Sequence, residues 1–285
     1  MRDTLDRFRP RKRLGQNFLV NQGAADTIIV AFGPRPDDLV LEIGPGRGAL
    51  THRLAGRVFK LVAVEIDPKL AVPLSEQMRA SSSVEIVQAD ILDLDLAALL
   101  QGLGATTARR ARVIANLPYS IATAVILRLI DERSLLSDLL VLVQREVAER
   151  IASPPGRKSY GGLSVLCQAH ARVEILLRLR PGSFRPIPKV DSELVRLTLQ
   201  RADEEPPMTG SAASLTLEAL LRTAFAQRRK TLLNNLVRLN GPGGGPIGSA
   251  AAADLIHSAG LDARARPEEI PVHGFLVLLR ALRAL

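Results

Sequence analysis

The sequence predicts an α/β fold in which helices cover both faces of a mainly parallel sheet, followed by a small all-helical domain. Short apolar runs alternate with helical stretches through the first part of the chain, which is typical of parallel strands joined by helices. A polar stretch over residues 201–210, which contains Pro206 and Pro207, then precedes a region with helical patterns only. We therefore expect one domain over residues 1–200 and a second over residues 211–285.

The predicted elements follow one another in a regular order. A helix over residues 22–31 precedes the sheet and ends at the Gly-Pro-Arg-Pro sequence that begins at Gly33. The strands of the parallel part are expected over residues 39–43, 61–66, 84–87, 113–115 and 139–143. Alternating stretches over residues 173–179 and 194–199 predict an antiparallel pair that completes the sheet. The C-terminal helices are expected over residues 214–239, 250–259 and 267–282.

Composition favours a polyanionic partner. The 285 residues include 38 Lys and Arg against 29 Asp and Glu, which gives a net charge of +9. Cations that neutralise phosphates release counterions and so increase affinity. A generally basic proteome would give the same balance, so charge alone leaves both interpretations open. Because only 3% of the residues are aromatic, any affinity for nucleic acid should be mainly electrostatic.

Other features argue against a membrane or metal protein. No apolar stretch approaches the roughly 20 residues that a bilayer-spanning helix needs, and we expect no secretory signal. The single cysteine, Cys167, cannot form an internal disulfide, which suits a reducing, cytoplasmic setting. The four histidines are scattered, and none lies in a cluster with ligand spacing. We therefore expect a monomeric cytoplasmic protein without a metal site.

A strand that runs into a glycine-rich turn, over residues 39–48, is a candidate nucleotide site. Glycines at positions 44, 46 and 48 let the backbone approach a ligand where a Cβ atom would collide. Open α/β sheets bind nucleotides at the carboxyl edge, where this turn is expected. The spacing G-x-G-x-G lacks the third glycine of the dinucleotide fingerprint, which argues against a nicotinamide cofactor.

The next two strands each end close to an acidic residue. Glu65 can accept hydrogen bonds from both hydroxyls of a ribose, although it could also be an ordinary polar residue at a strand end. Asp90 can accept a hydrogen bond from an adenine amino group, and Ile66 and Ile91 offer apolar faces to the ring. Together with Gly44 and Gly46, this combination resembles the S-adenosylmethionine site of class I methyltransferases, which implies that cofactor.

The fourth strand leads into Asn116-Leu117-Pro118-Tyr119, the candidate catalytic loop. An aromatic amine is a poor nucleophile because its lone pair is delocalised into the ring. The Asn116 side-chain oxygen and the Leu117 carbonyl could accept both N–H groups and orient that lone pair, while Pro118 fixes the turn. Tyr119 offers a ring for stacking, and positioning should be the main catalytic effect. The alternative is an ordinary turn after a strand.

Several motifs, in their order along the chain, resemble ribosomal RNA adenine dimethyltransferases. They lie at residues 11–19, 44–48, 116–119, 144–150, 184–192 and 225–231. The resemblance covers roughly residues 10 to 240 and is stronger for the bacterial small-subunit family, which dimethylates two adjacent adenines in the 3′-terminal hairpin of 16S rRNA. It therefore implies that reaction, with 16S rRNA in the assembling small subunit as the partner.

The resemblance also implies roles for individual residues. Asn17 and Leu19 would contact the cofactor together with the strand ends and Asn116. Phe184 would stack on the target adenine opposite Tyr119, as expected of an enzyme that must extract a base before acting on it. Without the resemblance, Phe184 would be interpreted as a loop aromatic that closes the core.

Three basic clusters are candidates for contact with RNA phosphates. They lie in the basic N-terminal arm, in a loop before the fourth strand and in the helical C-terminal domain over residues 211–285, which we therefore expect to dock RNA. The candidates are Arg11, Lys12, Arg13, Arg109, Arg110, Arg228, Arg229 and Lys230, with Arg112 beside the second cluster.

Three alternatives remain open. The sister group that methylates large-subunit (23S) rRNA and confers antibiotic resistance shares the cofactor site and a similar catalytic loop. A non-catalytic ribosome-assembly protein could retain the same fold. A nicotinamide oxidoreductase is a more distant third.

Overall fold

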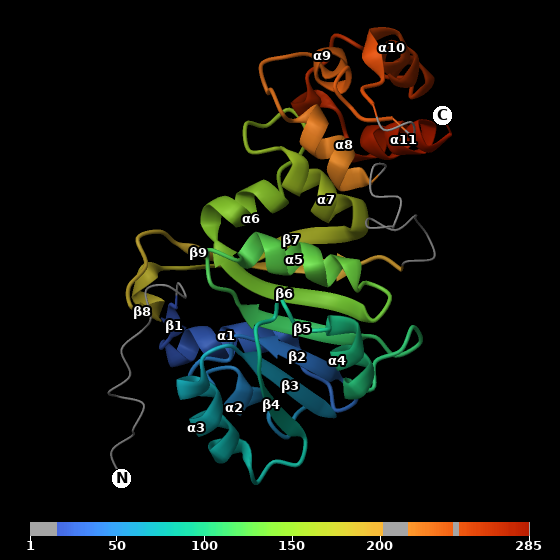
Figure 1. The fold of residues 1–285 in the computed structure, drawn as a ribbon. Helices are drawn as coiled ribbons and strands as arrows, with labels where there is room; N and C mark the ends of the chain where they lie inside the picture. Colours follow the sequence, from blue (N-terminus) through green and yellow to red (C-terminus); the bar gives the residue numbers. More distant parts are fainter. Residues whose placement is uncertain (1–15, 202–215, 242–244, 285) are drawn as a thin grey trace. The chain divides into compact units, whose positions relative to one another are not determined.

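The predicted α/β fold is present in the computed structural model, which describes residues 16–201, 216–241 and 245–284 (Figure 1). One sheet has the strand order β4-β3-β2-β5-β6-β9-β7. Its strands are β2 (Leu39–Ile43), β3 (Lys60–Glu65), β4 (Val84–Gln88), β5 (Ala111–Asn116), β6 (Leu136–Gln144), β7 (Ala171–Leu179) and β9 (Ser192–Leu199). Neighbours among β2 to β6 are parallel, whereas β9 runs antiparallel to β6. Each expected strand overlaps one of these, and the fold class is confirmed.

The chain folds into two units. Among the described residues, the first comprises 16–148 and 174–201, and the second comprises 149–173, 216–241 and 245–284. The sequence predicts one boundary after residue 200, whereas the structure groups residues 149–173 with the C-terminal helices. The reason is packing: Tyr160 is fully buried, and its hydroxyl donates to the Ile270 carbonyl at 2.9 Å. The expected linker at 202–210 and the start of the second domain at 211 lie outside the described residues.

Helices precede, join and follow the parallel strands of the first unit. They are α1 (Gln22–Phe32), α2 (Thr51–Leu54), α3 (Pro68–Met78), α4 (Leu96–Leu103), α5 (Ala122–Asp131) and α6 (Arg145–Ile151), the last of which crosses the boundary between the units. Helix α1 begins at Asn21, whose side chain accepts from the Ala24 amide, and ends at Gly33 in the left-handed conformation. Its apolar face and Leu54 of α2 pack against sheet residues such as Ile114 and Leu140 in one buried cluster.

A second, two-stranded pairing joins segments that are far apart in the sequence. Strand β1 (Phe18–Leu19) pairs antiparallel with β8 (Phe184–Arg185), with Leu19 opposite Phe184. Two-residue strands leave no periodic pattern in a sequence, so this pairing was not expected. It fixes the N-terminal segment beside the first unit's sheet.

The second unit is helical in its described part. Its helices are α7 (Gly162–His170), α8 (Leu217–Ala224), α9 (Leu232–Leu236), α10 (Gly248–Ser258) and α11 (Val272–Arg283). The single helix expected over residues 214–239 is two helices, because Thr231 caps α9 by accepting from the Asn234 amide. Phe225 lies 6.2 Å from Tyr160 and 5.5 Å from Phe275, measured between ring centroids, in the core of this unit.

In the part of the chain that the structure describes, every helix is too short or too polar to cross a membrane.

Candidate active site

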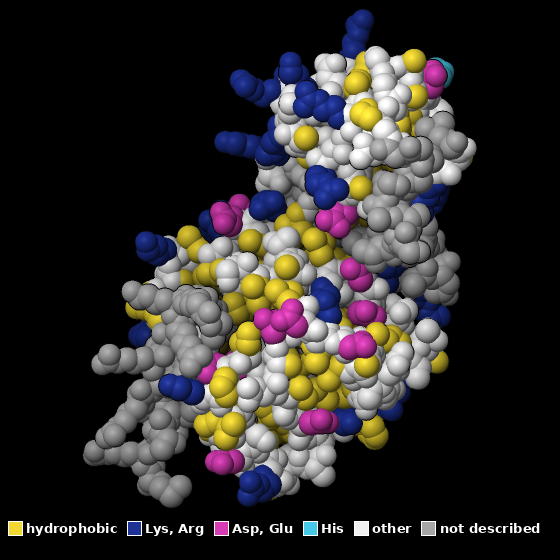
Figure 2. Space-filling model, in the orientation of Figure 1, with side chains coloured by type: hydrophobic (Ala, Val, Ile, Leu, Met, Phe, Trp, Pro, Cys, Tyr) yellow, Lys and Arg dark blue, Asp and Glu magenta, His cyan; other side chains and the backbone are white. Residues whose placement is uncertain are grey.

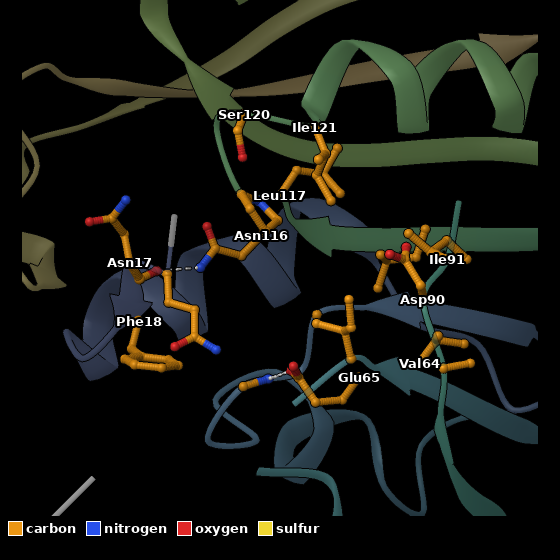
Figure 3. Close-up of a pocket in the computed structure, with 17 residues that line it drawn as sticks. Asn17, Phe18, Val64, Glu65, Asp90, Ile91, Asn116, Leu117, Ser120 and Ile121 are labelled. Carbon is orange, nitrogen blue, oxygen red and sulfur yellow. Dashed lines mark hydrogen bonds between the residues drawn. The ribbon is translucent and has the colours of Figure 1, made fainter. Parts of the chain in front are cut away.

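The carboxyl ends of the parallel strands meet at one edge of the sheet and form a pocket (Figure 3). The ladder continues past the strands, since the Gly44 amide donates to the Val64 carbonyl and the Ala89 amide donates to the Glu65 carbonyl. The pocket is lined by Gln16, Asn17, Phe18, Ile43, Gly44, Gly46, Val64, Glu65, Ile66, Ala89, Asp90, Ile91, Asn116, Leu117, Pro118, Ser120 and Ile121.

Most of the predicted cofactor residues therefore lie together. Leu19 is the exception: it is buried in the apolar cluster and lines a small neighbouring cavity. Gln16, Phe18 and Ser120 line the pocket without having been predicted. Gln16 and Phe18 flank Asn17, and Ser120 follows the tetrapeptide. Their position beside predicted site residues was the only feature of the sequence that could have indicated them.

The glycine turn needs its glycines. Gly44, Gly46 and Gly48 have φ angles of 66°, 57° and 78°, in the left-handed region that side chains disfavour. A Cβ atom on Gly46 would lie 3.0 Å from Cδ1 of Phe18, and one on Gly48 would lie 2.7 Å from Cδ1 of Leu74. The turn thus exposes backbone to the pocket and lets the N-terminal segment pack against it.

Glu65 joins the turn to the next helix. One carboxylate oxygen accepts from the Gly46 amide at 3.1 Å, and the other accepts from the Asp67 amide at 3.0 Å. Burial raises the pKa of Glu65, and the hydrogen bonds from Asp67 and Gly46 oppose that rise. Because an ionised carboxylate has about four acceptor sites, it can still accept from a ligand.

Glu42 is buried beneath the turn, at 2% exposure, and accepts from the Thr51 hydroxyl at 2.8 Å. Burial, with a smaller contribution from Glu65, raises the pKa of Glu42 to about 8. Sequence reasoning did not single it out, because an acid within an apolar strand resembles any other polar interruption.

We expect Glu42→Gln to reduce the dependence of folding stability on pH. The folded protein retains a proton that the unfolded chain loses near pH 4.5, so this group stabilises the fold most below that value. Its contribution is lost as the pH rises to about 8, by at most ~1.4 kcal/mol per pH unit. Urea unfolding at about pH 5.5 and about pH 8.5 measures the change. An unaltered pH dependence in the variant would mean that Glu42 is already ionised in the folded protein.

Asp90 lies in a loop that is held by hydrogen bonds. Its side chain accepts from the Leu92 amide at 2.9 Å, and the guanidinium of Arg128 in α5 donates to the carbonyls of Leu92 and Leu94. Ile91 is buried, whereas Ile66 is 42% exposed and presents its side chain at the pocket.

Asn116 is fixed by the N-terminal segment. Its side-chain nitrogen donates to the Asn17 carbonyl at 2.9 Å, which sets the orientation of the carboxamide (Figure 3). Within the described part of the chain, neither the Asn116 side-chain oxygen nor the Leu117 carbonyl accepts a hydrogen bond. Leu117 itself is held by its amide, which donates to the Leu142 carbonyl. Two acceptors without a hydrogen-bond partner thus belong to residues that line the pocket.

The two predicted stacking rings have different surroundings. Tyr119 is half-buried, its hydroxyl lies 2.9 Å from the Ser192 hydroxyl, and burial raises its pKa above the ordinary value of 10.0. Phe184 is 1% exposed and belongs to the apolar cluster that contains Ile28 of α1. Phe184 is therefore buried among apolar side chains in this structure, and its expected stacking on the target adenine stays a prediction.

The basic loop before β5 is tied into the fold. Arg112 contacts Asp38 at 2.6 Å and Asp138 at 3.0 Å. Arg110 donates to the Leu136 carbonyl, and Arg109 donates to a main-chain carbonyl and lies over the Phe59 ring. These side chains hold the start of β5, at the opposite end of that strand from Asn116. Contact of these side chains with RNA stays a prediction, and their intramolecular partners show that they also stabilise the fold.

The other basic candidates differ among themselves. Arg228 donates to the carbonyls of Lys158 and Tyr160, whereas Arg229 and Lys230 are exposed. Arg11, Lys12 and Arg13 lie outside the described residues. Over the described ranges, His, Cys, Asp and Glu do not group in threes that could hold a metal ion.

The strand order, the glycine turn after β2 and the pocket at the carboxyl ends of β2 to β5 define a class I methyltransferase. Solved structures agree on the fold. A dimethyladenosine transferase from Plasmodium falciparum superposes with a TM-score of 0.76 at 24% identity, over 94% of this chain and 98% of that one. The 23S rRNA methyltransferase ErmE gives a TM-score of 0.64 at 25% identity, over 94% and 100%.

Comparison of sequences then gives the family. The family model described as ribosomal RNA adenine dimethylase matches residues 7–245, and the chain belongs to this family. A ribosomal RNA small subunit methyltransferase A of Geobacter metallireducens is 42% identical over 98% of this chain and 97% of its own length. A protein of the same name from Acidobacterium capsulatum is 39% identical over 95% and 91%.

Proposed function

We propose that the chain uses S-adenosyl-L-methionine to dimethylate N6 of two adjacent adenines in the 3′-terminal hairpin of 16S rRNA, in the assembling small subunit. One observation carries the proposal. The Asn116 side-chain nitrogen is bonded to the Asn17 carbonyl, so its side-chain oxygen can accept a hydrogen bond from a substrate amine at the pocket. The names of relatives that match over nearly the whole chain support the small subunit as the substrate. We further propose a monomeric, cytoplasmic enzyme.

The pocket residues fit this cofactor. Gly44 and Gly46 offer backbone groups, and the carboxylate of Glu65 suits the two ribose hydroxyls. Asp90 suits the adenine amino group, and Ile66 and Ile91 would enclose the ring. When bound, the cofactor supplies an electrophilic methyl group on a sulfonium.

Asn116 and Leu117, which line the pocket, would orient the target amine for methyl transfer. The side-chain oxygen of Asn116 and the carbonyl of Leu117 would each accept one N–H of the adenine amino group. Both acceptors are held in place before substrate arrives, so little reorganisation is needed. Accepting both hydrogens favours a pyramidal nitrogen with its lone pair directed at the methyl group. Tyr119 would stack on the base, with Phe184 as the second proposed ring.

The hydrogen bond between Tyr119 and Ser192 predicts a measurable contribution to catalysis. Ser192→Ala and Tyr119→Phe should each reduce kcat/KM for RNA about 2- to 10-fold, because each removes one neutral hydrogen bond that orients the ring. The double variant should be no worse than either single variant. Ser137→Ala, which removes a hydroxyl bonded to the Ala111 carbonyl, is the matched control. Additive losses would show that the two hydroxyls act separately.

Methylation of isolated ribosomal subunits tests the proposed substrate. With labelled cofactor, label should enter small subunits from a strain without this modification and should not enter large subunits. The resemblance to a 23S rRNA methyltransferase makes the large subunit the informative alternative. Label in the large subunit alone would overturn the proposal, and label in neither would favour a non-catalytic assembly protein.

A further inference from the structure

The second unit contains a cavity of about 230 Å³ that shares no residue with the candidate active site. It lies where α8 ends, where the chain turns, and where α9 begins and ends. The lining residues are Arg222, Thr223, Ala226, Gln227, Asn234, Asn235 and Arg238.

The walls of this cavity are fixed by hydrogen bonds from one buried side chain. Asn235, at 3% exposure, accepts from the Gln227 amide and donates to the carbonyls of Gln227 and Thr231, at 3.1 to 3.2 Å. Arg228 anchors the same turn through the carbonyls of Lys158 and Tyr160, at 2.8 and 2.6 Å. The cavity is therefore formed before any ligand binds, which lowers the entropy cost of binding.

The residues that line the cavity carry positive charge without a neighbouring carboxylate in the lining. Arg222 and Arg238 are exposed, and neither guanidinium has an ion-pair or hydrogen-bond partner among residues 16–201, 216–241 and 245–284. The lining includes no carboxylate, while the side-chain amides of Gln227 and Asn234 add further donors. Arg112, by contrast, has two aspartate partners. Figure 2 shows Lys and Arg side chains gathered on the helical unit, with few Asp and Glu among them.

We propose that this cavity is a second RNA contact, which receives a phosphate of the RNA backbone between Arg222 and Arg238. Guanidinium groups match phosphate oxygens with paired hydrogen bonds. The volume is below the roughly 300 Å³ at which pockets for whole small molecules begin, so it suits a phosphate and part of its sugar. The inference rests on the proposed function in that RNA is the partner. It also assigns Arg228 to holding the turn, while the unpaired arginines beside it contact the RNA.

The salt dependence of RNA binding tests the proposal. Fluorescence anisotropy with a labelled 3′-terminal hairpin RNA, without cofactor, should show a weaker slope of log affinity against log salt for Arg222→Gln/Arg238→Gln. One lost phosphate contact lowers the slope by about 0.7 to 0.9. The matched control is Arg157→Gln/Arg264→Gln, which removes two exposed charges of the same unit that do not line the cavity. The control should keep the wild-type slope.

Three results would overturn the proposal. The first is a salt slope in the cavity variant equal to that of wild type. The second is a salt slope that falls as much in the control variant as in the cavity variant. The third is that millimolar inorganic phosphate weakens RNA binding equally in the cavity and control variants. Binding of S-adenosylhomocysteine and kcat at saturating RNA should stay within about 2-fold of wild type in the cavity variant, because the catalytic pocket is untouched. RNA binding is measured without methyl transfer, so the two proposals can fail separately. If the cavity variant shows the weaker salt slope but the wild-type chain does not methylate the RNA, only the proposed function is contradicted.

Discussion

Asn116→Ala is expected to lower kcat for methyl transfer by about 10²- to 10³-fold, the cost of removing one preorganised polar group from a reacting centre. The variant lacks the acceptor for the amine and also the donor that fixes the side chain on the Asn17 carbonyl. Affinity for RNA should remain nearly that of wild type, because Asn116 lies at a pocket and not on a basic surface. Single-turnover transfer to RNA, with binding measured in parallel, separates the two effects.

Asn17→Ala is the control for this variant. The acceptor for Asn116 is the main-chain carbonyl of Asn17, which the substitution keeps. Asn17 lines the pocket, so the substitution should at most raise KM for the cofactor while leaving kcat within a few fold of wild type. Turnover close to wild type in Asn116→Ala would refute the role of Asn116.

Glu65→Ala should weaken binding of S-adenosylhomocysteine by at least about 10²-fold. Two hydrogen bonds from ribose hydroxyls to a carboxylate are each worth about 1.5 to 3 kcal/mol, and the variant loses both. It also frees the amides of Gly46 and Asp67, which shape the turn. Isothermal titration calorimetry measures the affinity directly.

Two further variants keep the Glu65 prediction testable if the alanine variant folds poorly. Glu65→Asp keeps the charge and shortens the side chain, so it should fold and still lose about 10-fold or more in affinity. Glu76→Ala removes the same charge from an exposed position on the following helix and should bind like wild type. Wild-type affinity in Glu65→Asp and Glu65→Ala would remove Glu65 from the cofactor site.

The strand ends could be located from the sequence because their spatial relation follows from topology. Parallel strands share a carboxyl edge, so Glu65, Asp90 and Asn116 had to approach one another once each was placed after its strand. The N-terminal wall of the pocket could not be located in the same way. It depends on the pairing of Leu19 with Phe184, a contact between distant segments with no local pattern.

Exposure and pairing explain the remaining differences. The sequence marks Phe184 as an aromatic residue in a loop, but only the tertiary packing shows that it is buried in one cluster with residues of α1. Likewise, a run of arginines in the sequence indicates positive charge, but it does not show which acidic side chains pair with those arginines in the fold. Arg112 is neutralised by Asp38 and Asp138, which are distant in sequence, whereas Arg222 and Arg238, which formed no run and were not predicted, are unpaired in the described structure.

Mass spectrometry of 16S rRNA fragments after incubation of undermethylated small subunits with the enzyme and cofactor tests the central claim most directly. The proposed function predicts a mass increase of four methyl groups, confined to the fragment that contains the 3′-terminal hairpin and divided equally between two adjacent adenines. The Asn116→Ala enzyme should leave that fragment unmodified. Methyl groups on another base, on a single adenine or on 23S rRNA would contradict the proposal.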